Sequence, residues 1–311
     1  MIPNTTTRTS RANPVTSVES DAENHPPSFR SGFVTFVGRP NVGKSTLINQ
    51  ILGTKVSIVS DKVQTTRTQV RGIYNRPDSQ IVFVDTPGIH RPRSLLGERS
   101  NEAATSSIGD VDVVCVVLDA TMPLGKGDRF VAARAPRSAL LVVNKIDQAS
   151  RDDVLAMLRQ SGAFDFAEYF PVSAATGAGV DVLTEAIVSR MPEGPAYYPT
   201  DVLADVDETF WVAELVREQL LHITSEELPH SIACRVTEWE EREGRGPYVR
   251  VEVLVERDSQ KPIVIGKGGN VLKAVGVAVR EQLPAGSYLD IHVKVDREWQ
   301  RRPKSLDRLG Y

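Results

Sequence analysis

The stretch Gly38-Arg39-Pro40-Asn41-Val42-Gly43-Lys44-Ser45 fits the pattern G-x-x-x-x-G-K-[ST]. It follows an apolar run at 33–37 and opens a segment with helical periodicity, as a phosphate-binding loop requires. Glycines let backbone N–H groups wrap a β-phosphate, and the helix N-terminus adds positive potential. Lys44 is expected to bridge the β- and γ-phosphates, and the Ser45 hydroxyl to bind Mg²⁺. The predicted nucleotide contacts of this loop are Gly38, Asn41, Val42, Gly43, Lys44, Ser45 and Thr46.

Short apolar strands alternate with helical segments around this loop. Helical periodicity appears at 154–158 and at 180–191. The strands, each bounded by turn-forming residues, are expected at 33–37, 80–84, 112–118 and 139–143. This alternation predicts an α/β domain over residues 31–191, with a mostly parallel sheet and helices on both faces.

Two motifs directly after predicted strands extend the site. In Asp85-Thr86-Pro87-Gly88, Asp85 is expected to hold Mg²⁺ through a water molecule, and the Gly88 N–H to contact the γ-phosphate. In Asn144-Lys145-Ile146-Asp147, the Asp147 carboxylate would accept hydrogen bonds from guanine N1–H and the 2-amino group. Adenine offers neither donor in that geometry, so the predicted nucleotide is GTP or GDP rather than ATP.

Further residues are predicted to complete the base site. Asn144 and Lys145 should brace the base and the phosphate loop, while Ser173-Ala174 should donate a backbone N–H to guanine O6. The four elements occur in chain order, each at the C-terminal end of a strand, where open α/β sheets bind ligands. Together they predict a GTP-binding site.

The two switch loops are predicted at 60–67 and at 88–96. One threonine of the first loop should complete the Mg²⁺ shell, and we favour Thr66 over Thr65. Both loops should order around the γ-phosphate and relax after hydrolysis. The residues assigned to catalysis are Lys44, Thr66 and Gly88.

Ile89 stands where many GTPases carry a glutamine that orients water. Hydrolysis is therefore expected to be slow, or assisted by another group. Asn41 is a candidate ligand for a monovalent cation such as K⁺, which could supply positive charge. Among the other candidates, Arg67, Arg91 and Arg93 are more simply explained as exposed solubilising charges, and His90 is disfavoured as a general base.

The remainder of the chain predicts a linker and a second, smaller domain. Residues 192–200 are rich in proline and glycine, which is typical of a linker. Over 201–311, an apolar helix face from Val212 to Ile223 leads the domain. Strands are expected at 230–238, 248–255 and 288–295, with a helix at 270–283 before the last strand. This order indicates an α+β domain.

Gly266-Lys267-Gly268-Gly269 lies between an expected strand end at Val264-Ile265 and a helix, and matches the GXXG loop of KH domains. We predict RNA binding by Gly266, Lys267, Gly268, Gly269 and Lys273. Acidic residues are interspersed among the neighbouring basic ones, so a solvated mixed face remains an alternative for each of the latter. Trp299 could stack on a base, or pack the C-terminal segment against the domain.

Composition limits the function classes. The net charge of -3 gives no general preference for nucleic acid, so an RNA site must be local. No apolar run of 18 residues and no secretory signal is present, and Cys115 and Cys234 are expected to be buried thiols. These features predict a cytoplasmic protein. Residues 1–30, poor in aliphatic side chains, are expected to be disordered.

From residue 31 to its end the sequence resembles the Era family of bacterial ribosome-assembly GTPases. The motifs that carry the resemblance are Gly38–Ser45, 64–67, 85–90, Asn144–Asp147, Ser173-Ala174, 226–231, Gly266–Gly269 and the closing Leu309-Gly310-Tyr311. The resemblance implies a KH domain of type II topology, binding near the 3′ end of small-subunit (16S) ribosomal RNA, and a role in maturation of the 30S subunit. It also implies a hydrophobic residue at Ile89, and peripheral association with the inner face of the cell membrane in some members.

Three functions are therefore weighed. The first is a monomeric GTPase that times ribosomal RNA maturation, with nucleotide state controlling RNA affinity through domain arrangement. The second is an RNA adapter with a purely structural nucleotide site, against which the complete Mg²⁺ shell argues. The third is a membrane-associated or cell-cycle signalling GTPase whose KH-like domain binds protein. The intact Gly266–Gly269 loop argues against the third.

Overall fold

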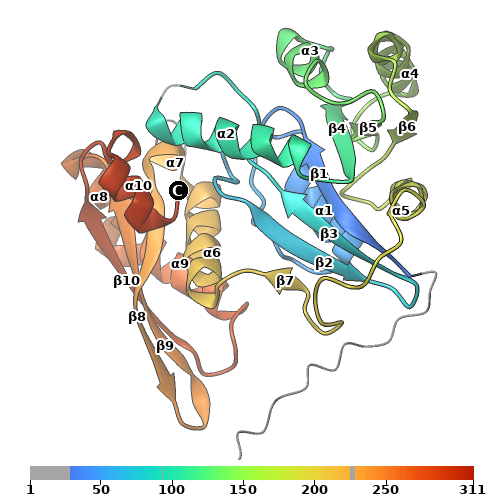
Figure 1. Cartoon of the computed structure of the whole chain (residues 1–311). Coiled ribbons are helices and arrows are strands. Elements are labelled where there is room, and N and C mark those ends of the chain that lie inside the picture. The colour runs from blue at the N-terminus through green and yellow to red at the C-terminus, as the bar shows by residue number, and fades with distance from the viewer. Residues whose placement is uncertain (1–28, 93, 225–227) are drawn as a thin grey trace, which may run out of the picture.

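The computed structural model describes residues 29–92, 94–224 and 228–311 (Figure 1). The expectation of a disordered N-terminus therefore lies almost wholly outside the described residues. Its upper bound needs correcting, because Phe29 is buried and Arg30 begins the first strand. Arg30 also donates a hydrogen bond to the Met191 carbonyl, at 2.7 Å.

The first domain is built on a seven-stranded sheet with the order β6-β5-β4-β1-β3-β2-β7. Five strands are parallel, while β2 is antiparallel to β3, and β7 is antiparallel to β2. Strand bounds are β1 Arg30–Val37, β2 Val70–Asn75, β3 Ser79–Asp85, β4 Val113–Asp119, β5 Leu140–Asn144, β6 Glu168–Pro171 and β7 Ala204–Asp205. The predicted mostly parallel sheet is confirmed.

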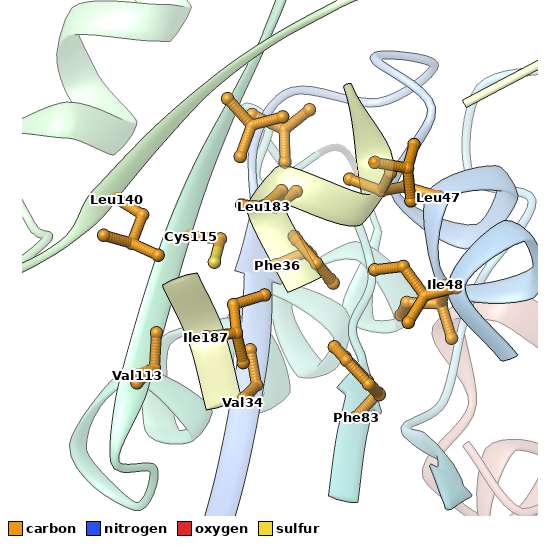
Figure 2. Packing of buried hydrophobic residues seen from close by; sticks show 14 of the residues in the cluster. Val34, Phe36, Leu47, Ile48, Phe83, Val113, Cys115, Leu140, Leu183 and Ile187 are labelled. Atoms are coloured by element: carbon orange, nitrogen blue, oxygen red, sulfur yellow. The ribbon is translucent and has the colours of Figure 1, made fainter. Parts of the chain in front are cut away.

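Helices cover both faces of this sheet, as predicted (Figure 1). Helices α1 (Lys44–Leu52) and α5 (Val180–Val188) pack on one face, and Figure 2 shows Leu47, Ile48, Leu183 and Ile187 around the Phe36 ring. Side chains of α2 (Leu95–Gly109), α3 (Lys126–Ala132) and α4 (Arg151–Ser161) form a separate buried cluster with strand residues such as Val116 and Leu141.

The second domain has a three-stranded sheet with the order β10-β9-β8. Strand β10 runs parallel to β9, and β8 runs antiparallel to it. The bounds are α6 Glu208–Ile223, α7 Leu228–Ser231, β8 Ala233–Arg242, β9 Arg245–Val255, α8 Lys261–Ile265, α9 Asn270–Arg280, β10 Tyr288–Val295 and α10 Pro303–Leu309. Cys234 is buried here, and Cys115 is buried in the first domain.

Two predictions for this domain were wrong in detail. The run before the GXXG loop is the short helix α8, not a strand end, and Pro262 in its first turn favours a helix start. The strand expected from 230 begins at Ala233, because Leu228–Ser231 form the helical turn α7.

The predicted linker packs on the first domain. Gln80 Oε1 accepts hydrogen bonds from the Tyr197 and Tyr198 N–H groups at 2.7 and 2.9 Å, and the Pro195 carbonyl accepts one from Ser31. Strand β7 then joins the first sheet, although it falls within the 201–311 range that we assigned to the second domain. Sheet membership therefore moves the boundary to the turn between β7 and α6.

The segment Asp258–Arg280 has the length and mean hydropathy of a membrane span. It is nevertheless a chain of short helices, interrupted where Gly266, Gly268 and Gly269 take positive φ angles. Such a composition is weak evidence for a membrane role, since its α9 side chains Val275 and Val279 belong to the core of the second domain.

Candidate nucleotide site and its contact with the second domain

The phosphate loop connects β1 to α1, and Gly43 occupies the left-handed region with φ of 96°. A Cβ atom at Gly43 would lie 2.3 Å from Asn144 Nδ2, so glycine is required both for conformation and for space. Lys44 is buried, with Nζ 3.3 Å from the Arg39 carbonyl and 3.5 Å from the Gly38 carbonyl. Burial lowers the Lys44 pKa to about 8, although the Asp85 carboxylate opposes this shift.

Three predicted Mg²⁺ ligands come together at the end of β3. Ser45 Oγ donates to Asp85 Oδ2 at 2.7 Å, and Thr66 Oγ1 lies 3.0 Å from Ser45 Oγ. Thr65 Oγ1 instead bonds with Ser60 Oγ and the Lys62 carbonyl, both at 2.7 Å, which supports the choice of Thr66.

The surroundings of the Asp85 carboxylate show whether this site suits a cation. It is fully buried, and its Oδ1 atom has no hydrogen-bond donor among the described residues. Burial therefore raises the Asp85 pKa. Hard divalent cations prefer such oxygen ligands, so Ser45, Thr66 and Asp85 fit Mg²⁺.

The base-reading motif is held in a hydrogen-bonded frame. Asn144 Nδ2 donates to the Val42 carbonyl at 2.9 Å, which ties the motif to the phosphate loop. Asp147 Oδ1 accepts a hydrogen bond from Ser173 Oγ at 2.6 Å, and this bond lowers the Asp147 pKa, keeping the carboxylate ionised. Lys145 pairs with Asp119 at 2.6 Å, so Asp119 is a site residue that the sequence analysis missed.

Ser173 and Ala174 lie beside the base-reading motif, but both N–H groups have partners within the protein. The Ala174 N–H donates to Asn144 Oδ1 at 2.9 Å, and the Ser173 N–H donates to the Ala178 carbonyl at 2.8 Å. To form the predicted bond to guanine O6, one of these two N–H groups must therefore share its hydrogen bond with guanine or leave its present acceptor.

The second switch segment contacts the phosphate loop. A Cβ at Gly88 would lie 2.6 Å from Pro40 N, so only glycine allows this close approach. Ile89 is buried within the α2–α4 side of the core, where its side chain cannot orient water. His90 Nδ1 lies 2.9 Å from the Gly88 carbonyl, and His90 Nε2 lies 2.6 Å from Gln64 Nε2 in the first switch segment. His90 therefore connects the two switch segments.

Asn41 also contacts the first switch segment. Its Nδ2 atom donates to the Asp61 carbonyl at 2.6 Å, and its backbone has a positive φ of 65°. Because the amide nitrogen makes this bond, the side-chain oxygen is the atom that could act as a cation ligand.

Arg67 is not the exposed solubilising charge that the sequence suggested. Its side chain is 4% exposed and donates to the Ile232 carbonyl at 2.7 Å and to the His230 carbonyl at 3.3 Å. Its guanidinium carbon lies 5.3 Å from the Trp299 ring centroid and 5.6 Å from that of Tyr311. Arg67 directly follows Thr66, so the second domain holds the end of the first switch segment.

Helix α6 holds the same segment from the other side. The fully buried Arg217 donates to the Thr65 carbonyl and pairs with Glu214, while Glu218 Oε1 accepts from the Val59 N–H at 2.9 Å. We call Arg67, Glu214, Arg217, Trp299 and Tyr311 the interdomain cluster. Sequence analysis missed Arg217, although a charged pair at spacing i,i+3 on an apolar helix was the available signal.

The second switch segment also meets the second domain, and Figure 1 shows α2 reaching α7 and α10. Leu96 is buried with Ala233, Trp299 and Leu306. Arg99 Nη1 donates to Asp307 Oδ1 at 2.7 Å. Both switch segments therefore pack against the second domain.

The GXXG loop lies at the surface of the second domain, between α8 and α9. Gly266, Gly268 and Gly269 have positive φ angles, and Lys267 and Lys273 are exposed, so the loop presents backbone and positive charge to solvent. Trp299 is not available for base stacking. It is fully buried and donates from Nε1 to the Ser231 carbonyl at 2.9 Å, because it packs the C-terminal segment into the interface.

The first domain has a mostly parallel sheet and a set of residues arranged to bind guanine, and the second domain has a KH-type fold. Together they define a P-loop GTPase joined to a KH domain. Comparison with known families agrees, since the family described as "50S ribosome-binding GTPase" matches residues 33–145 and "KH domain" matches 227–302. The chain is 48% identical to GTPase Era of Mycolicibacterium smegmatis, over 91% of this chain and 99% of the relative. It is 46% identical to GTPase Era of Nocardioides sp., over 92% and 97%.

Solved structures give the same result. An Aquifex aeolicus Era variant bound to GDP and aluminium fluoride superposes with a TM-score of 0.86, at 36% identity, over 91% of this chain and 99% of that chain. Era in complex with MgGDPNP and nucleotides 1506–1542 of 16S ribosomal RNA also gives 0.86, at 37% identity and the same coverage. The chain belongs to the Era family of GTPases, and it is a GTP-hydrolysing enzyme.

Proposed function

We propose that this protein is a GTP-controlled switch that binds small-subunit ribosomal RNA near its 3′ end and assists maturation of the 30S subunit. The observation that carries the proposal is the joint presence of a GTP site and an exposed GXXG loop, in two domains that pack against each other through the switch segments. The similar Era structure that contains 16S ribosomal RNA supports the choice of RNA.

In the proposed hydrolysis, Lys44 contacts the phosphates and the Gly88 N–H contacts the γ-phosphate. Ser45, Thr66 and Asp85 would hold Mg²⁺, which neutralises charge on the phosphates when bound. Ile89 supplies no polar group for water, so hydrolysis proceeds slowly unless a further charge assists it. The Asn41 side-chain oxygen is the proposed ligand for K⁺, which would supply such a charge.

In the proposed RNA complex, the GXXG backbone approaches four nucleotides while Lys267 and Lys273 contact phosphates. The apolar side chain of Ile263, 58% exposed on α8 beside the loop, offers a surface for bases. Nucleotide state would alter RNA affinity through the interdomain cluster, because Arg67 and Arg217 connect the first switch segment to this domain.

We place the protein in the cytoplasm as a monomer, and peripheral contact with the inner membrane face remains a prediction. The signalling alternative, in which the KH-like domain binds protein, has no contact in the described structure that favours it over RNA. The exposed glycine backbone and Lys267 favour a phosphate-bearing partner.

Binding of a labelled single strand that copies the 3′ end of small-subunit ribosomal RNA tests the RNA assignment. A strand of equal length with scrambled sequence is the control, at one fixed salt concentration. Gly268→Asp places a carboxylate in the loop, where a Cβ meets no atom within 4 Å, while the positive φ of 60° adds local backbone strain to the loop. We expect this variant to lose binding while it keeps GTP hydrolysis, and undiminished binding would contradict the RNA assignment.

A further inference from the structure

A pocket of about 640 Å³ lies within the second domain, between the start of α6, the β8–β9 hairpin and the segment after α9. We call it the hairpin pocket, and its volume is in the range of ligand-binding sites. The GXXG loop precedes α9, whereas Leu283 and Pro284 of the pocket follow the end of α9. The 11 residues of α9 span about 16 Å, so the two sites are separate.

Aromatic and proline rings form the apolar part of the hairpin pocket. Trp211 of α6 and Trp239 of β8 are both half-buried, so each indole packs on the core and also lines the pocket. Pro247, Leu283 and Pro284 complete this apolar surface. Surfaces of this kind bind proline-containing segments, and the face of an indole ring also attracts a guanidinium group.

Two carboxylates lie at the same pocket. Glu208 and Glu241 line it, and Trp239 Nε1 donates to Glu241 Oε1 at 2.7 Å, which holds this carboxylate beside the indole ring. Neither carboxylate forms an ion pair with any residue in the described ranges, and Arg245 is the one cationic residue of the described lining. The hairpin pocket therefore suits a cationic group that also makes apolar contacts.

The hairpin wall of the pocket is fixed by hydrogen bonds. Arg242 Nη2 donates to the Gly246 and Gly286 carbonyls, both at 2.6 Å, and the Gly246 N–H donates to the Ala285 carbonyl at 3.1 Å. A Cβ at Gly246 would lie 2.5 Å from Ser287 Oγ, so glycine allows the hairpin to approach the segment after α9. The pocket is thus formed before any ligand binds.

The chain carries a segment whose chemistry matches this pocket. Residues 1–28 lie outside the described structure, and their sequence places Arg8, Arg11 and Pro14 at intervals of three. Three residues make one turn of a polyproline II helix, so these side chains would share one edge of such a helix. Residues 1–18 contain no aspartate or glutamate, so their charge is opposite to that of the two pocket carboxylates.

The segment is long enough to reach the pocket. The Phe29 carbonyl accepts a hydrogen bond from the Gly194 N–H at 3.1 Å, so residues 1–28 begin beside the linker that leads to α6. The chain from Gly194 to Glu208 can span at most about 50 Å. The longer chain from Phe29 back to Arg11 can span about 59 Å.

We propose that residues 8–15 bind in the hairpin pocket of the same chain, with Arg8 and Arg11 at the indole rings and carboxylates, and Pro14 on the apolar surface. The intervening residues hold the segment near the pocket at an effective concentration in the millimolar range, so individually weak contacts suffice. The bound segment covers the two tryptophans and excludes other basic, proline-containing segments from this surface. The proposal is independent of the RNA-binding function.

Limited proteolysis of the full-length protein tests the proposal. Trypsin cleaves after Arg8 and Arg11, and a glutamate-specific protease cleaves after Glu23, which lies outside the proposed contact. Mass spectrometry gives the initial rate at each of these positions. A synthetic peptide of residues 1–28 provides the rates for the unbound segment.

Two double variants are compared with the unmodified protein. Glu208→Gln with Glu241→Gln removes the carboxylates of the pocket, and both side chains are exposed. Glu240→Gln with Glu243→Gln is the matched control, because it removes equal charge from exposed hairpin positions that do not line the pocket. An unchanged rate of GTP hydrolysis shows that each variant is folded.

We expect trypsin to cleave after Arg8 and Arg11 about tenfold more slowly in the unmodified protein than in the peptide, because cleavage follows the population of the unbound segment. The pocket variant should lose most of this protection, whereas the control variant should keep it. Cleavage after Glu23 should have the same rate in all of these proteins.

Three results would overturn the inference. Equal trypsin rates in the unmodified protein and the pocket variant would show that the pocket does not hold the segment. Equal acceleration in the pocket and control variants would assign the protection to net charge. Protection that grows with protein concentration would show that the segment binds a second copy of the chain instead of its own.

Discussion

Lys44 carries a buried ammonium group whose hydrogen-bond acceptors are two main-chain carbonyls of its own loop. Burial lowers its pKa to about 8, so about half of the free protein has a neutral Lys44 at pH 8. Phosphate oxygens nearby would raise this pKa, so nucleotide binding must take up protons. Nucleotide affinity is accordingly highest below pH 8 and falls as the pH rises above it.

We predict uptake of about half a proton per GDP bound at pH 8. Calorimetric titrations in buffers of different ionisation enthalpy measure this number directly. Lys44→Met is the control, because it removes the titrating group, and its binding should show no such uptake. Equal uptake by the variant and the unmodified protein would assign the proton to another residue.

The local motifs could be predicted from the sequence, whereas the burial of Arg67 could not, and for Trp299 the sequence left stacking and packing as open alternatives. A phosphate loop depends on residues adjacent in the chain, so its pattern carries its geometry. Arg67 contacts Ile232 and Trp299, more than 160 positions away, and nothing in its own neighbourhood reveals burial. Which residues are buried between two domains depends on how the domains pack, and a local sequence pattern does not reveal that packing.

Trp299 gives a prediction about its packing role, the alternative that its burial supports. Trp299→Phe retains a buried ring but removes the donor to the Ser231 carbonyl, which should cost about 1–3 kcal/mol of unfolding free energy. RNA affinity per folded molecule should stay the same, because the ring is fully buried. Chemical denaturation and RNA titration measure the two effects, and a selective loss of RNA affinity would restore the stacking role.

At the scale of elements, α6 supplies the contacts that fix the first switch segment. The Glu214–Arg217 pair is almost wholly buried, and removing one partner of such a pair costs about 3–5 kcal/mol because the other charge remains uncompensated. Replacing both by apolar residues restores much of the stability. The double replacement can therefore separate the contribution of the charged pair to stability from the effect of the hydrogen bond that Arg217 donates to the Thr65 carbonyl.

We predict that Arg217→Met lowers both stability and GTP hydrolysis, and that adding Glu214→Leu restores stability alone. Hydrolysis should remain reduced about tenfold in the double variant, since the Thr65 carbonyl still lacks its donor and Thr66 is less well placed. Denaturation curves and single-turnover hydrolysis provide the readouts. Full recovery of hydrolysis in the double variant would show that Arg217 contributes to stability alone.

The elements that the sequence did not predict correctly include the shortest ones, and also the six-residue strand β2. Helix α8 has five residues and α7 has four, too few to display helical periodicity, so Val264-Ile265 resembled a strand end. Strand β7 has two residues and is recognisable only by its pairing with β2. Strand β10 was predicted at its observed bounds, whereas β9 begins before its predicted range and β8 ends after its own.

On the scale of the whole molecule, the proline- and glycine-rich segment predicted a linker between two domains, and the described contacts show an extensive interface between those domains. Arg67, Leu96 and Arg99 of the first domain all contact the second, and each belongs to or borders a switch segment. This arrangement predicts that RNA binding and nucleotide state are coupled, with equal factors in both directions.

Affinity for the ribosomal RNA 3′-end strand, measured in the GTP-analogue and GDP forms at fixed salt, is the direct measure of this coupling. We predict tighter binding in the GTP-analogue form, with the difference abolished in the Glu214→Leu/Arg217→Met variant and all binding abolished in Gly268→Asp. Equal affinity in the two nucleotide forms of the unmodified protein would contradict the coupling, and leave an RNA-binding GTPase whose two sites act independently.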